Sequence, residues 1–206
     1  MNMRLTLLAA VTTVTLTSSL LAQAPLTLRG ELDEGRSTGC YYCPNVPYTI
    51  KFSETPVRSK TIDLAPYKAL SAQLVLTGYW DTTVSPAGLE VTSVAVVTES
   101  LSVNNTARTG TNLRYTTYGP ARSVAATVIA GGNGFVPLFG TALLLDGGSL
   151  TLLGASVLGG AGSWRFELPI PANASLIGLR FWSQSLVIPP SGSPFSTNPG
   201  RTLIDR

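Results

Sequence analysis

Short runs of β-prone residues, each ended by a turn-forming residue, constrain the fold of this chain most strongly. Val, Ile, Leu, Thr and Tyr fill these runs, and Gly, Pro, Asn and Asp lie between them. Helical periodicity is confined to one or two turns at residues 64–70. The sequence therefore predicts an all-β protein, with strands at residues 26–32, 48–52, 72–79, 89–97, 124–130, 141–145, 150–153, 164–168 and 179–188.

The N-terminus carries the three-part pattern of a secretory signal peptide. Arg4 gives a positive start, a charge-free apolar stretch follows, and Ala22 and Ala24 place small residues at the cleavage site. Pro25 directly follows Ala24, so cleavage after Ala22 is the alternative. An uncleaved, membrane-spanning anchor fits the sequence less well than a cleaved signal peptide, because several Thr and Ser residues dilute the apolar stretch. We expect residues 1–24 to be removed and the mature protein to be secreted, periplasmic or at the cell surface, without a transmembrane segment.

Charged residues are few and scattered, and histidine is absent. The 44% hydrophobic content is ample for a core, whereas Lys, Arg, Asp and Glu make up only 12% of the chain. Because the basic residues form no cluster, we expect no nucleic-acid partner. Without histidine the chain lacks the commonest general base and the commonest metal ligand. The sequence predicts a protein that is not an enzyme and that needs neither cofactor nor metal.

Composition changes near residue 100. Charges recur every few residues before this point, whereas between Arg122 and Arg165 only Asp146 is charged and Gly is dense. The polar, turn-rich stretch at residues 102–112 is typical of a linker. We therefore expect an N-terminal domain at residues 25–100, a linker at residues 101–114 and a C-terminal domain at residues 115–206.

Five segments of the expected N-terminal domain follow a characteristic order. They are a Gly-bearing strand at residues 27–32, a strand at 48–52, the short element at 64–70, a strand ending in Gly78-Tyr79-Trp80, and LEVTSV at 89–94. This order resembles the small OB-like five-stranded barrels of secreted bacterial proteins. The resemblance implies a barrel whose surface binds an oligonucleotide, an oligosaccharide or a peptide, without naming the ligand.

The second half of the chain has its own series of short motifs. They are PLFG at residues 137–140, LLGAS at 152–156, LPIP at 168–171, LIGLRFWSQ at 176–184, and STN at 196–198 before a terminal strand at 202–204. These motifs resemble a β-sandwich module found at the C-termini of exported bacterial proteins, which implies an accessory part without activity of its own. The expected fold is thus an OB-like five-stranded barrel followed by an antiparallel β-sandwich.

Cys40 and Cys43 form the sharpest local motif. In an exported protein, two such cysteines favour a structural disulfide. A redox-active dithiol is an alternative, but it is typical of a βαβ context that the surrounding sequence does not show. Shared metal ligation is a third interpretation, and it would need two further ligands from carboxylates or from a second chain.

Four aromatic residues are candidates for ligand binding. Tyr41 and Tyr42 lie between the cysteines, and Tyr79 and Trp80 end a predicted strand. Together they suggest a platform on which a sugar or peptide stacks. Alternatively, Trp80 plugs the barrel and the two tyrosines cover its mouth.

The function predicted from these features is that of an exported, non-enzymatic binding or cell-surface-associated protein. Its expected partner is a glycan, peptide or protein ligand at the cell surface. Two alternatives stay open: a thiol–disulfide redox protein that uses Cys40 and Cys43, and a structural component of the cell envelope.

Overall fold

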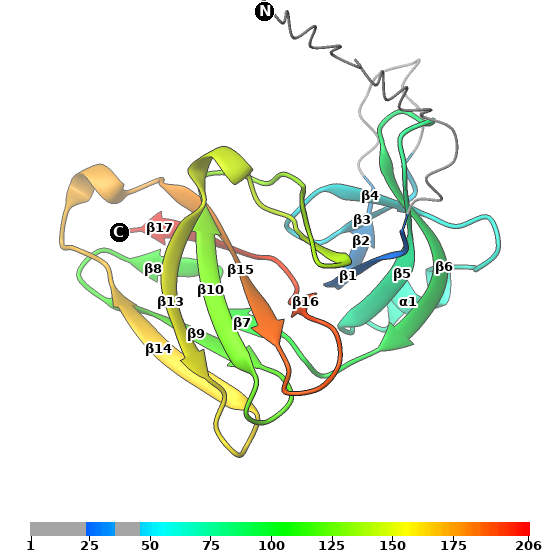
Figure 1. Ribbon diagram of the computed structural model, residues 1–206. Coiled ribbons are helices and arrows are strands. Elements are labelled where there is room, and N and C mark those ends of the chain that lie inside the picture. The colour runs from blue at the N-terminus through cyan, green and yellow to red at the C-terminus, as the bar shows by residue number, and fades with distance from the viewer. Residues whose placement is uncertain (1–23, 36–45) are drawn as a thin grey trace, which may run out of the picture.

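Strands make up most of the computed structural model, which describes residues 24–35 and 46–206 (Figure 1). Within these residues the strands are interrupted by one α-helix, α1 (Ala65–Ala69), and by 3-10 turns at Gly147–Ser149 and Ala174–Leu176. The all-β prediction is confirmed, and α1 lies where the short helix was expected. No helix among the described residues is both long and apolar enough to cross a membrane. The signal peptide, up to residue 23, and the Cys40–Cys43 motif lie outside the described residues.

Eight strands form the first sheet, which curves into a half-barrel (Figure 1). Apolar residues alternate along its central strands, as in Leu26 and Leu28 or Leu74 and Leu76, and pack into one buried cluster. In spatial order the strands are β11 (Val136–Leu138), β12 (Thr141–Leu143), β1 (Leu26–Gly30), β5 (Leu74–Asp81), β6 (Gly88–Val96), β4 (Thr55–Arg58), β3 (Tyr48–Ile50) and β2 (Leu32–Glu34).

Two further sheets pack against each other in the second half of the molecule. Tyr115 and Phe166 of the smaller sheet share a core with Phe181 and Ile204 of the larger one. The larger sheet runs β13 (Thr151–Val157), β10 (Val124–Ala130), β15 (Arg180–Ile188), β17 (Gly200–Asp205) and β8 (Thr106–Arg108), with β16 (Phe195–Ser196) beside β15. The smaller sheet consists of β14 (Ser163–Pro169), β9 (Asn112–Tyr118) and β7 (Leu101–Val103).

The segment expected as a linker, residues 101–114, is instead built into these two sheets. It contains β7, β8 and the start of β9. Leu101, Ala107 and Leu113 are buried in the core that the sheets share. The polar residues between them point to solvent, and this alternation gave the segment its linker-like composition.

A strand pair from the second half of the chain extends the first sheet. β12 pairs in parallel with β1 at Thr27 and Thr141, and β11 pairs with β12. Ala142 and Leu144 are part of the buried cluster of the first sheet. The sheet therefore has eight strands where the resemblance implied a five-stranded barrel. The division of the chain into two domains stays a prediction.

Candidate functional site

A pocket of about 600 Å³ lies over the face formed by β2, β3 and β4. Its floor includes Asp33, Thr49 and Pro56, which are direct neighbours in the strand register. Side chains of directly paired residues point to the same face of a sheet, so these three form a row. The turn after β3, Pro86 and Arg201 of β17 line the rest of the pocket.

The turn after β3 has an unusual backbone. Phe52 and Glu54 have φ angles of 68° and 58°, in the left-handed region that non-glycine residues seldom adopt. The buried Ser53 between them holds the turn from inside: its Oγ donates to the Ile50 carbonyl at 3.0 Å and accepts from the Thr55 N–H at 3.2 Å. Such a conformation persists only where its surroundings determine it, and it is common at functional sites.

Two side chains from the second half of the chain hold the turn from outside. Trp182 Nε1 donates to the Phe52 carbonyl at 2.8 Å, and Asn133 Nδ2 donates to the Ser53 carbonyl at 2.6 Å. The carbonyls of the two peptides that flank the Ser53 Cα are therefore bound by residues distant in sequence. The Phe52 ring owes its position at the pocket to the second half of the molecule.

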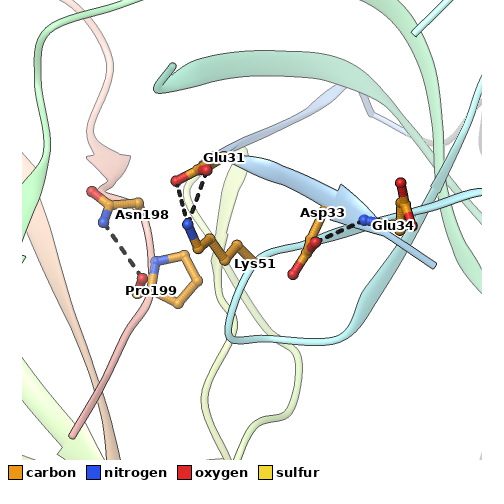
Figure 2. Close-up of polar contacts among 6 residues, drawn as sticks. All are labelled: Glu31, Asp33, Glu34, Lys51, Asn198 and Pro199. Atoms are coloured by element: carbon orange, nitrogen blue, oxygen red, sulfur yellow. Dashed lines mark hydrogen bonds and ion pairs between the residues drawn. The ribbon is translucent and has the colours of Figure 1, made fainter. Parts of the chain in front are cut away.

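Both cationic side chains that line the pocket lie near the Phe52 ring. Lys51 Nζ is 5.6 Å and Arg201 Cζ is 5.5 Å from the ring centre, within the range of a cation–π interaction. Figure 2 shows Lys51 turned toward Glu31, where Nζ donates to both carboxylate oxygens at 2.9 Å. In contrast, the Arg201 guanidinium makes no hydrogen bond or ion pair within the described part of the chain.

The segment that leads into β17 fixes the place of Arg201. The Asn198 side chain accepts from the Leu101 N–H at 2.7 Å and donates to the Leu101 carbonyl at 3.0 Å. It also lies 3.4 Å from the Pro199 carbonyl, a contact drawn in Figure 2. Asp33 accepts from the Glu34 N–H at 2.9 Å on the other side of the same view. Hydrogen bonds to the backbone therefore hold both Asn198, just before β17, and the Asp33 carboxylate of the pocket floor.

Two of the four aromatic residues predicted for ligand binding, Tyr79 and Trp80, are described, and both lie away from this pocket. Trp80 packs against the first core and stacks on Phe135 with ring centres 3.9 Å apart, while Tyr79 points to the opposite face and is 38% exposed. Neither lines the pocket. Cys40, Tyr41, Tyr42 and Cys43 are outside the described residues, so their roles stay predictions.

Sequence reasoning did not single out Phe52 or Arg201. Phe52 stands in a run of mixed charge, and nothing in its type indicates a left-handed backbone. Arg201 had one available signal: it is a basic residue near the end of a charge-poor region. That signal identifies a candidate but not its partner ring on the other half of the molecule.

A second pocket, of about 430 Å³, lies on the outer face of β7, β9 and β14. Its main charges already satisfy each other, because Asn112 and Arg114 donate to Glu167 at 3.0 and 3.1 Å. These bonds hold the pKa of the Glu167 carboxyl below its usual range. Within the described residues no group of His, Cys, Asp or Glu has an arrangement suited to a metal ion.

Comparison with known proteins gives no identification. No family model matches the chain, and no curated protein sequence matches it. Among solved structures, a superoxide reductase (neelaredoxin) from Ignicoccus hospitalis matches with a TM-score of 0.36 and 7% identity, over 53% of this chain and 81% of that one. A similarity of this size carries no argument about function, which therefore has to come from the site itself.

Proposed function

We propose that this chain is an exported, non-enzymatic binding protein that holds a glycan or peptide in the Phe52 pocket. The observation that carries the proposal is the left-handed turn at Phe52, bound by Trp182 and Asn133 at the edge of the pocket. A volume of about 600 Å³ falls within the usual range of ligand pockets. An aromatic ring among a few fixed polar groups is the usual lining of such a site.

The finer parts of the proposal come from the sequence. The signal-peptide pattern supports export and a place outside the cytoplasm. In that compartment we propose a structural disulfide between Cys40 and Cys43. The OB-like order of segments and the sandwich motifs support a ligand-binding barrel with an accessory sandwich, and OB barrels bind ligands on their strand faces and loops.

A binding screen with matched variants tests the proposal. The mature protein, beginning at Pro25, is applied to arrays of glycans and peptides beside Phe52→Ala and Phe139→Ala. Phe139 is the control because it also has a positive φ, of 49°, but is 70% exposed and does not line the pocket. We expect Phe52→Ala to weaken binding of the identified ligand at least tenfold and Phe139→Ala to leave it unchanged.

Circular dichroism and thermal melting confirm that both variants are folded. A ligand bound equally well by Phe52→Ala would contradict the proposed site. A Tyr41→Ala/Tyr42→Ala double variant in the same screen tests the stacking platform predicted from the sequence.

A structural role in a multimer is the second candidate, and the outer face of β13, β10 and β15 favours it. Val157, Val124 and Ile188 lie side by side across these strands and are 58%, 45% and 44% exposed. Exposed apolar patches of this kind mark interaction surfaces. Within the described residues β13 pairs only with β10, so its other edge is open to a second copy of the chain.

Antiparallel pairing of two β13 strands about Ala155, with Leu153 left out of the register as it is in the pairing of β13 with β10, would set Leu152 of one protomer against Val157 of its partner and continue the apolar face. Light scattering coupled to size exclusion tests this arrangement. We expect a concentration-dependent dimer that Val157→Glu abolishes, with Thr151→Glu as the control on the same strand. A monomer at every concentration would eliminate the structural candidate and leave the binding proposal intact.

A further inference from the structure

We infer that the Phe52 pocket recognises a saccharide that bears a carboxylate, with Arg201 as the partner of that carboxylate. This inference rests on the proposed binding function and adds the chemical class of the ligand. It follows from which polar groups of the pocket are already bound within the protein and which are not.

Arg201 is the lining cation whose hydrogen-bonding capacity is unused within the described residues. Lys51, the other one, is neutralised by both oxygens of Glu31. The Arg201 side chain is half-buried, and its one described interaction is with the Phe52 ring. A guanidinium presents its donors in a planar fork that matches a carboxylate, so an acidic group is the ligand chemistry that fits here.

The pocket floor offers groups suited to sugar hydroxyls. The Thr49 hydroxyl makes no hydrogen bond to the described residues, and Asp33 uses one carboxylate oxygen, toward the Glu34 N–H. A carboxylate accepts from hydroxyls, and a threonine hydroxyl both donates and accepts. The Phe52 and Pro56 rings supply the apolar surface on which the CH face of a sugar ring packs.

An extended peptide fits the same floor less well. Strand recognition of a peptide needs unpaired backbone groups along an edge. β3 lies between β2 and β4 and is paired with both, so the centre of the floor presents side chains instead of a free strand edge. Recognition by hydroxyl, carboxylate and guanidinium side chains therefore favours a saccharide over a peptide.

Calorimetric titration of the mature protein with three probes tests the inference. Trigalacturonate is the acidic probe, its fully methyl-esterified form is the matched neutral probe, and inorganic sulfate is the simple anion. We expect the ester to bind at least tenfold more weakly than the acid. Arg201→Gln should weaken the acid at least tenfold and change the ester less than twofold, whereas Arg180→Gln, an exposed arginine of the same sheet, should change neither.

The outcomes separate the two levels of the proposal. Equal binding of acid and ester, both lost in Phe52→Ala, would overturn the acidic-ligand inference but support the binding site. Sulfate that displaces the acid at equal concentration would overturn it in favour of a general anion site. Absence of binding by both saccharides would also overturn it, and the wider screen with Phe52→Ala then decides the proposed function. If Arg201→Gln does not fold, Arg201→Lys replaces it in the titration. This variant keeps the charge but not the planar fork of donors, so we expect it to bind the acid with intermediate affinity.

Discussion

The first sheet and the two packed sheets of the second half have interiors of different character. The first sheet buries one cluster of aliphatic side chains, including Leu28, Leu76 and Leu89. The two packed sheets have two smaller clusters, and between them lie the buried hydroxyls of Thr117, Thr127 and Ser185. Ser185 Oγ is 2.8 Å from the Oγ1 atom of each threonine. Transfer of apolar surface from water stabilises the first interior, whereas the second also depends on hydrogen bonds that fix one arrangement of its sheets.

The interface between the first sheet and the two packed sheets, here called the joint, is held by both hydrogen bonds and apolar packing. Gln184 is fully buried there: its Oε1 accepts from the Leu144 N–H at 2.7 Å, and its Nε2 donates to the Thr197 carbonyl at 2.6 Å. Leu144 belongs to the first core. The comparison shows that polar bonds between the two halves set the position of the Phe52 turn at the pocket. The half-barrel itself is held together by apolar packing.

Leu76→Ala should have one of the two largest effects on stability. Leu76 is fully buried in the aliphatic cluster, so truncation removes its packing and leaves a cavity. We expect the free energy of unfolding, measured by urea titration, to fall by about 2 to 5 kcal/mol. Leu152→Ala on the exposed outer face is the control, with an expected change within about 0.5 kcal/mol. Similar losses in the two variants would remove the distinction between core and outer face.

Gln184→Leu tests the joint. The substitution keeps the approximate volume but leaves the Leu144 N–H and the Thr197 carbonyl buried without their partner. Each unsatisfied buried group costs about 1 to 3 kcal/mol, so for two groups we expect a total loss of about 2 to 6 kcal/mol in the same titration. If the leucine variant is as stable as the parent, apolar packing alone holds the joint.

The buried hydroxyls give a sharper test of how the two packed sheets are held together. Ser185→Ala removes the group that links Thr117 and Thr127, and we expect a loss of about 1 to 2 kcal/mol. The triple variant Thr117→Val/Thr127→Val/Ser185→Ala removes all three polar groups together and should be more stable than the single variant. A triple variant that is less stable than Ser185→Ala would show that the hydroxyls stabilise the fold beyond satisfying one another.

Local signals were sufficient to predict the all-β class and strands such as Val124–Ala130. They depend on alternation and on turn residues within a few positions. The joint and the pocket depend on distant partners. The bonds from Asn133 and Trp182 that hold the Phe52 turn span 80 and 130 residues. The parallel pairing of Thr141 with Thr27 spans a similar distance and has no local signature.

Gln184 illustrates the limit of motif resemblance. The sequence marked it as part of a segment typical of an accessory sandwich, but its type and spacing did not indicate what it binds. The same holds for Arg201, whose unused guanidinium becomes a feature only once β17 and the Phe52 turn lie at one pocket. The sequence pattern was sufficient to locate strands. The roles of Gln184 and Arg201 depend on contacts between the two halves of the chain.

Lowering the pH should change the stability of the protein least, and it should act on both the first sheet and the two packed sheets. Hydrogen bonds from Thr83 lower the pKa of Asp81 in the first sheet, and those from Asn112 and Arg114 lower the pKa of Glu167 in the three-stranded sheet. A folded pKa below the unfolded value stabilises the protein above the unfolded pKa, and this stabilisation is lost as the pH falls through the folded pKa. We therefore expect Asp81→Asn and Glu167→Gln each to lower the melting temperature slightly near neutral pH. The difference from the parent should shrink as the pH falls below about 4, and a difference that grows in acid would contradict the assignment of these bonds.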